Sequence, residues 1–190
     1  IYKLLIGFLI TGIFLITIFF ITRDKKVYYL SLGDSLAAGQ TPNNSIGLSY
    51  GDYVSEYLKD KEVLEFYTKS FAKSGYRSID LLNDLKNNKT VKINGKSLTI
   101  KHALIKADIV TLSIGSNDLF YKLNIGNEFD LNEFDDIYTY VDESIKDIDK
   151  LLYELRKSCK EQIMVFGFYN NFTAFSSTLA NTVEPVILYA

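Results

Sequence analysis

Two short apolar runs that each end at a glycine restrict the fold of this chain most strongly. Residues 27–32 are rich in β-branched, aromatic and aliphatic side chains and stop at Gly33, which predicts a strand. Residues 108–114 form a second run that stops at Gly115. Its nearly continuous apolar character is typical of a strand buried on both faces of a parallel sheet.

Helical patterns alternate with these strands. Apolar residues at helical spacing predict helices over residues 50–58 and 134–157. Ser78 is a good N-cap and predicts the start of a further helix. The side chains expected to face inward from that helix are Ile79, Leu82 and Leu85.

Further strand patterns complete the prediction of the fold. Strands are predicted over residues 63–66 and 162–168, and the Asn94-Gly95 pair predicts a hairpin inserted over residues 91–100. The alternation of strands and helices favours a doubly wound, flavodoxin-like α/β fold with three α/β/α layers. In such sheets the ligand site lies beyond the carboxyl ends of the strands.

The amino-terminal segment differs in character from the rest of the chain. Leu4 to Thr22 is a run of 19 residues without a charge, which at about 1.5 Å per residue is long enough to cross a bilayer. A buried core helix would show a polar face, and a cleaved signal peptide would end in small residues, but this run shows neither. We therefore expect a transmembrane anchor over residues 1–22, a linker over 23–26 and one domain over 27–190.

Charge and cysteine content exclude several classes of protein. Without Lys3, residues 23–190 hold 20 Lys and Arg against 23 Asp and Glu, a net charge of −3. This is no electrostatic footprint for nucleic acid. The single cysteine, Cys159, excludes an internal disulfide and a cysteine-rich metal site, and it is expected to be a packing residue.

Three polar turns carry the candidate chemistry. Gly33-Asp34-Ser35-Leu36 can present a hydroxyl beside the N–H groups of a helix start, where negative charge is favoured. In Ala72-Lys73-Ser74-Gly75 the glycine allows a backbone N–H to approach a ligand closely. In Gly115-Ser116-Asn117-Asp118 the asparagine can aim its side-chain amide over the strand ends. Taken singly, each turn is also compatible with a plain helix cap or turn.

In this order, the three turns resemble the SGNH hydrolases, also called GDSL esterases and lipases, over residues 27 to about 171. The resemblance implies that Ser35 is the nucleophile. It also implies an oxyanion hole made by the N–H groups of Ser35 and Gly75 and the side-chain amide of Asn117. Asp34 and Asp118 would brace the loops by hydrogen bonds, and neither a metal nor a cofactor is needed. The chain lacks the G-x-S-x-G elbow of α/β-hydrolases.

The resemblance also implies a base that this chain does not show. The family takes its histidine and the orienting aspartate from an Asp-x-x-His block near the carboxyl terminus. The sequence reaches Ala190 without such a block, so we expect the triad His and Asp to be absent, the domain to be incomplete at its carboxyl end, and the chain to be a fragment or an interrupted gene product with little activity. The only histidine, His102, is predicted at the amino end of a strand, where a solvated or packing role is expected.

The sequence therefore favours a membrane-anchored serine esterase that cleaves acyl or acetyl esters of lipids or cell-envelope glycans. The charges Arg23, Lys25 and Lys26 behind the anchor favour a cytoplasmic domain, whereas the resemblance implies an extracytoplasmic one. A non-catalytic domain that binds an acyl or glycan ligand is the alternative. A flavodoxin-like nucleotide binder fits the fold but lacks a phosphate loop. The oligomeric state is left open.

Overall fold

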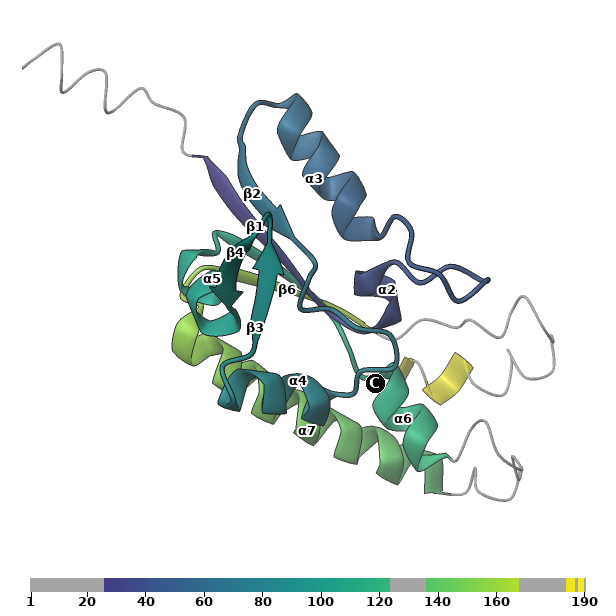
Figure 1. Cartoon of the computed structure of the whole chain (residues 1–190). Helices are drawn as coiled ribbons and strands as arrows, with labels where there is room; N and C mark the ends of the chain where they lie inside the picture. Colours follow the sequence, from purple (N-terminus) through teal and green to yellow (C-terminus); the bar gives the residue numbers. More distant parts are fainter. Residues whose placement is uncertain (1–25, 124–135, 168–183, 187, 190) are drawn as a thin grey trace, which may run out of the picture.

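The computed structural model describes residues 26–123, 136–167, 184–186 and 188–189 (Figure 1). The elements in chain order are β1 (Val27–Gly33), α2 (Ser35–Ala38), α3 (Tyr50–Asp60), β2 (Leu64–Thr68), α4 (Ser78–Lys86), β3 (Thr90–Ile93), β4 (Lys96–Thr99), α5 (Ile100–Lys106), β5 (Ile109–Ser113), α6 (Ser116–Lys122), α7 (Ile137–Ser158) and β6 (Gln162–Phe166).

A parallel sheet of four strands forms the centre of the molecule, in the order β2-β1-β5-β6. Counted along the chain, these strands give the order 2-1-3-4, which begins the flavodoxin-like order. The predicted α/β fold with a parallel sheet is confirmed. The connection after β1 leads to β2 and the connection after β5 leads to β6, in opposite directions along the sheet. The switch point therefore lies between the carboxyl ends of β1 and β5, where such folds bind ligands.

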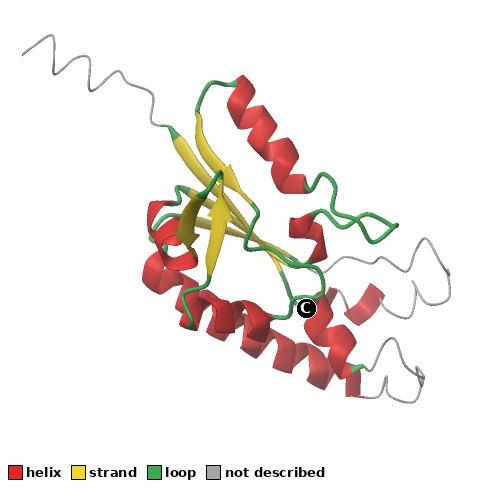
Figure 2. Cartoon of the chain, in the orientation of Figure 1, coloured by secondary structure: helices red, strands yellow, loops and turns green. Residues whose placement is uncertain are grey.

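Helices cover the sheet on both faces (Figure 2). On one face, α4, α5 and α7 enclose the main core, because alternate side chains of β1 and β5 point to the same side. Leu30, Leu32, Val110 and Leu112 are fully buried there. Cys159, at the end of α7, is a buried free thiol within the same core, as expected of a packing residue.

The opposite face of the sheet carries hydroxyl groups and lies under α3. Tyr29 Oη and Thr111 Oγ1 are 2.9 Å apart, and Ser31 Oγ donates to Tyr50 Oη at 3.4 Å. The helix approaches closely through Gly51, where a Cβ would lie 2.7 Å from Tyr67 Oη. The close approach of α3 to this face therefore depends on the small residue Gly51.

Tertiary contacts decide which side chains of α3 and α4 are buried. The helix predicted over residues 50–58 exists, but Tyr53 and Tyr57 are exposed, because the contact with the sheet runs through Gly51. The inward position predicted for Ile79 is wrong, since its side chain is exposed and Leu81 is buried instead. The inward positions of Leu82 and Leu85 are confirmed. Ser78 is the first residue inside α4 rather than its N-cap, and it shares the buried face with these leucines and Leu81.

The hairpin prediction is confirmed. Strands β3 and β4 form a separate antiparallel pair, and Asn94 and Gly95 both have positive φ at its turn. Such φ values match the twist of a two-residue hairpin. The pair lies outside the parallel sheet, as an insertion should.

The described part of the chain contains no helix that is long and apolar enough to cross a membrane. The predicted anchor at residues 1–22 and nearly all of its linker lie outside the described residues. Much of the segment that follows β6, residues 168–183, also lies outside them.

Gly33 is the position where the sheet tolerates a side chain least, and it yields a first prediction. Its φ is +127°, and a Cβ there would lie 1.8 Å from the carbonyl oxygen of Ser113. We expect Gly33→Ala to lower the free energy of unfolding by about 2–5 kcal/mol, from backbone strain and overpacking together. Urea unfolding followed by circular dichroism measures this.

Gly95→Ala is the matched control. Gly95 also has positive φ, but a Cβ there would meet no atom within 4 Å. Gly95→Ala should lower the free energy of unfolding by only about 1–2 kcal/mol, which is the usual cost of placing a non-glycine residue in the left-handed conformation. Equal losses in the two variants would show that contact with Ser113 does not constrain this turn.

Candidate active site

The first turn of the site joins β1 to α2. The backbone N–H of Asp34 donates to Ser113 O at 2.9 Å, and its side chain caps α2 by accepting from Leu36 N at 3.1 Å. Ser35 is the first residue of α2 and is partly exposed. The sequence therefore places a serine hydroxyl at the carboxyl edge of the sheet, outside the core.

Asp34 is a buried carboxyl at the junction of two strands. It is 3% exposed and accepts a hydrogen bond from Ser113 Oγ at 3.0 Å. Burial raises the pKa of Asp34, and the hydrogen bonds from Ser113 and Leu36 offset only part of that rise. The side chain thus links the ends of β1 and β5 on either side of the switch point.

The second loop follows β2 and rests against the first turn. Lys73 N donates to Gly33 O at 3.0 Å. Gly75 is exposed, has a φ of +78°, and would have no atom within 4 Å of a Cβ. Its backbone is therefore uncovered on the side where a Cβ would stand.

The third loop begins at Gly115 and leads into α6. Asn117 Nδ2 donates to Tyr76 O at 2.9 Å, so the asparagine lies beside the residue that follows Gly75. A carboxamide carries two N–H donors, and this bond uses one of them. The amide is thereby held in a fixed orientation at the rim.

Asp118 joins the third loop to the second. Its carboxylate accepts from Ser78 N at 2.9 and 3.1 Å and also from Ser78 Oγ. Burial raises the pKa of Asp118, hydrogen bonds from Ser78 oppose the rise, and the charge of Asp147 adds to it. This contact fastens the start of α6 to the start of α4.

Hydrogen bonds therefore bring the three sequence-predicted loops together at one rim. The catalytic roles of Ser35, Gly75 and Asn117 stay predictions. The sequence-based reasoning missed the partners of these loops, namely Ser113, Tyr76 O and Ser78. Ser113 could have been noticed as a hydroxyl residue within an apolar strand, directly before the Gly115 turn.

His102 does not belong to this rim. It lies exposed on α5, which precedes β5, whereas Asn117 follows β5. The two therefore lie toward opposite ends of that strand, as expected from the sequence. Among residues 26–123, 136–167 and the described part of 184–189, no cluster of His, Cys, Asp and Glu could hold a metal.

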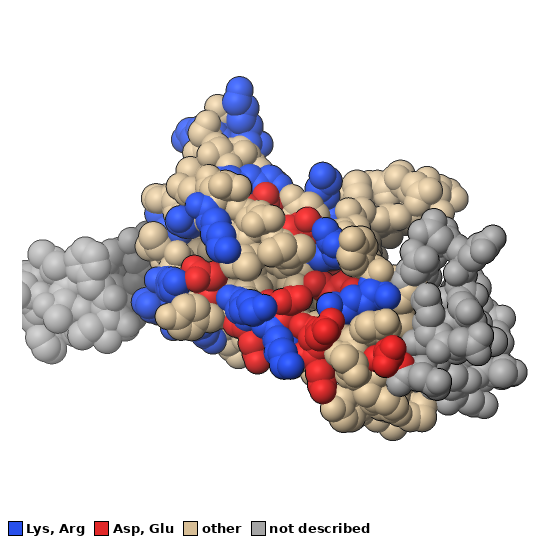
Figure 3. All heavy atoms as spheres, turned by 90° about the horizontal axis from the view of Figure 1, so that it is seen from below, with Lys and Arg blue, Asp and Glu red and all other residues tan. Residues whose placement is uncertain are grey.

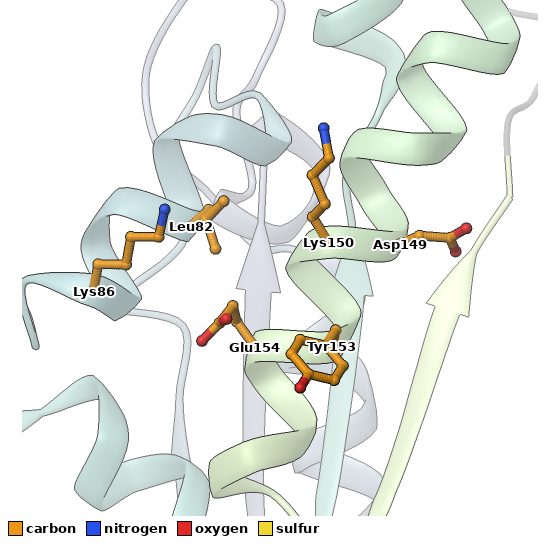
Figure 4. A pocket seen from close by; sticks show the side chains of 6 residues that line it. All are labelled: Leu82, Lys86, Asp149, Lys150, Tyr153 and Glu154. Atoms are coloured by element: carbon orange, nitrogen blue, oxygen red, sulfur yellow. The ribbon is translucent and has the colours of Figure 1, made fainter.

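A cavity of about 400 Å³ lies away from the rim, between α4 and α7. Figure 4 shows Leu82 and Lys86 from one helix facing Lys150 and Glu154 from the other. Basic and acidic side chains are mixed on the face seen from below in Figure 3. The cavity offers no clear preference for a ligand charge, and none of the candidate catalytic residues lines it.

Comparisons with known proteins identify the family and support the fold. The family model described as GDSL-like Lipase/Acylhydrolase matches residues 29–186. No protein of curated function matches the sequence.

Three solved structures share the fold. The lipase Lip_vut3 from a goat rumen metagenome has a TM-score of 0.56 at 20% identity, covering 84% of this chain and 71% of that one. A point variant of Axe2, an acetyl xylan esterase from Geobacillus stearothermophilus, has a TM-score of 0.50 at 19% identity, with coverages of 87% and 70%. A point variant of the esterase AlinE4 has a TM-score of 0.50 at 18% identity, with coverages of 88% and 74%.

The raised pKa of Asp34 predicts how its replacement alters stability with pH. Folding favours the protonated form of Asp34, because its pKa is higher in the folded protein than in the unfolded chain. The protonated carboxyl therefore contributes its full stability below the pKa of the unfolded chain, about 3.9. That contribution is lost as the pH rises through the pKa of the folded protein. Asn carries no charge. The free energy of unfolding of Asp34→Asn, relative to that of the unchanged protein, should therefore rise when the pH is raised from about 3.5 to about 7. The rise should be about 1.4 kcal/mol for each unit by which folding raises the pKa of Asp34.

Urea unfolding at the two pH values measures this difference. Asp60→Asn, at an exposed position at the end of α3, is the control for the loss of one negative charge. A loss of relative stability for Asp34→Asn on raising the pH would contradict the prediction.

Proposed function

Because this chain belongs to the GDSL-like lipase/acylhydrolase family, we propose that it is a serine ester hydrolase with Ser35 as its nucleophile. The observation that carries the proposal is the set of hydrogen bonds that ties the three loops into one rim. Asp34 binds Ser113, Lys73 binds Gly33 and Asn117 binds Tyr76. A partly exposed serine, an open glycine and an oriented amide lie on these loops.

The proposed reaction proceeds through an acyl-serine. Ser35 Oγ attacks the acyl carbon and gives up its proton, the bond to the alcohol oxygen breaks, and the alcohol leaves carrying that proton. Water then attacks the acyl-serine, which releases the carboxylic acid and restores the serine hydroxyl. Negative charge develops on the carbonyl oxygen during each attack. The N–H groups of Ser35 and Gly75 and the Asn117 amide would stabilise it, and each such donor is typically worth about 10²–10³ in rate.

The two buried aspartates are proposed to position the loops. Asp34 and Asp118 are engaged with Ser113 and Ser78, so their oxygens are committed to holding backbone turns. Their raised pKa values follow from the burial that this role requires. Neither is proposed to exchange protons with substrate.

We propose no proton acceptor for the reaction among the described residues. The sequence has one histidine, and His102 lies on α5 away from the rim. Loss of a triad histidine costs about 10⁶ in kcat in a serine protease. For these 190 residues we therefore expect slow turnover that depends on the oxyanion donors.

Substrate and location are also proposals. The charge-free run from Leu4 to Thr22 supports a single-pass anchor, and we propose that the domain lies outside the cytoplasm. Acyl or acetyl esters of lipids or envelope glycans would be the substrates. The neighbours named above, a lipase and an acetyl xylan esterase, are compatible with either class.

The position of His102 supports a second candidate function, a domain that keeps the fold and binds an acyl or glycan ligand without cleaving it. The two functions differ in whether Ser35 reacts. A saturable ester ligand that never acylates the chain would favour the binding domain.

Ser35→Ala tests the enzyme. With a fluorophosphonate, the unchanged protein should slowly form one adduct at Ser35, because this serine lies beside the proposed donors. Intact-mass spectrometry should show no adduct in Ser35→Ala, and p-nitrophenyl acetate hydrolysis should fall to background.

Ser97→Ala, in the exposed hairpin strand β4, is the matched control and should behave as the unchanged protein. If Ser35→Ala formed the adduct or hydrolysed the ester at the same rate as the unchanged protein, Ser35 would not be the nucleophile.

A further inference from the structure

The loop between α2 and α3, residues 39–49, carries two large aliphatic side chains in solvent. Ile46 is 62% exposed and Leu48 is 68% exposed. Leu36, directly after the candidate nucleophile, is 40% exposed. Aliphatic side chains at such exposure have no role in the core, and exposed apolar surface can mark a ligand-binding site.

Hydrogen bonds connect this loop directly to the turn of Ser35. The N–H groups of Gly39 and Gln40 both donate to Ser35 O at 2.9 Å. Gly47 N donates to Gly39 O at 2.7 Å, and Gln40 pairs with Ile46 in an isolated bridge. Ile46 and Leu48 flank Gly47. Gly47 is hydrogen-bonded to Gly39, and Gly39 is hydrogen-bonded to the carbonyl of Ser35.

The loop is ordered by its own contacts. Thr41 N donates to Ser45 O at 2.8 Å, and the Thr41 and Ser45 hydroxyl oxygens are 2.7 Å apart. A Cβ at Gly39 would lie 2.6 Å from Gly47 O, so the two sides of the loop touch through a glycine. The aliphatic side chains are thus presented on a preorganised backbone, which lowers the entropic cost of binding.

A half-buried ion pair anchors the far side of the loop. Lys69 Nζ donates to Gly47 O at 2.7 Å and to Asp52 Oδ2 at 2.6 Å. Asp52 in turn accepts from Ser49 N at 2.6 Å. Burial by itself would raise the pKa of Asp52, but the hydrogen bonds from Lys69 and Ser49 outweigh it and lower the pKa. The carboxylate is therefore charged near neutral pH and holds Lys69 on the loop.

We propose that Leu36, Ile46 and Leu48 form the contact surface for the acyl chain of the ester, and that the protein prefers long acyl chains over acetyl. An acyl group bonded to Ser35 begins at the turn to which this loop is attached. Burial of apolar area is the interaction that such side chains offer. This inference rests on the proposed function only for the identity of the attacking serine, since binding of an acyl chain can be measured without turnover.

The sequence contains no tryptophan, so a single substitution supplies a selective reporter. In Leu48→Trp, a dibrominated octadecanoic acid, kept below its micelle concentration, should quench the fluorescence saturably. Ile105→Trp is the matched control, because Ile105 is also 68% exposed but lies on α5 at the other end of the sheet. Its fluorescence should not respond.

Equal quenching at both positions, or none at either, would overturn the proposal. A third outcome is that vesicles of brominated phosphatidylcholine quench Leu48→Trp when the monomeric fatty acid does not. That result would show that the loop binds a bilayer surface, and it would also overturn the proposal. These outcomes do not depend on hydrolysis.

Hydrolysis gives a second, independent measurement. In the double variant Ile46→Ser, Leu48→Ser, the ratio of kcat/KM for p-nitrophenyl octanoate to that for p-nitrophenyl acetate should fall about tenfold or more, as expected when two apolar contacts are lost. Ile105→Ser should leave the ratio unchanged. An unchanged ratio in the double variant contradicts the proposal, whereas hydrolysis that survives Ser35→Ala contradicts the proposed function instead.

Discussion

The hydrogen bonds between Asp34 and Ser113 are the contacts on which the candidate site depends. The backbone N–H of Asp34 and its carboxylate both bind Ser113, so the ends of β1 and β5 are joined twice. Only glycine fits before this link, because Gly33 lies against the Ser113 carbonyl. These hydrogen bonds join β1 to β5 at the switch point of the sheet. Ser35 is the next residue after Asp34 and begins α2.

The remaining loops are held to that link by polar contacts of the same kind. Lys73 binds Gly33 through the backbone, Asn117 binds Tyr76, and Asp118 binds Ser78. Burying two carboxyls works against stability, as their raised pKa values indicate. A packed apolar rim would avoid that cost but could not orient hydrogen-bond donors toward a single point. The polar contacts therefore hold the loops together at some cost in folding free energy.

The loops after β2 and β5 carry chemical groups that differ from those of the loop before α3. The loops after β2 and β5 bring a glycine and an amide to the site, which suits charge stabilisation. The loop before α3 instead displays Ile46 and Leu48, which suits an apolar part of a ligand. Lys69 and Asp52 keep that loop in place through their own ion pair. In the proposed function, chemistry and acyl selectivity would thus depend on separate sets of contacts.

The sequence by itself determined the parallel α/β fold, the hairpin at Asn94-Gly95 and the three loops of the site, because strand composition, glycine positions and turn residues are local properties. Only the tertiary structure decided which side chains those loops bind and which faces the helices bury. Asp118 draws Ser78 inward, so Leu81 rather than Ile79 is buried, and Gly51 sets the approach of α3. These outcomes depend on contacts between residues far apart in the chain, which no local pattern records.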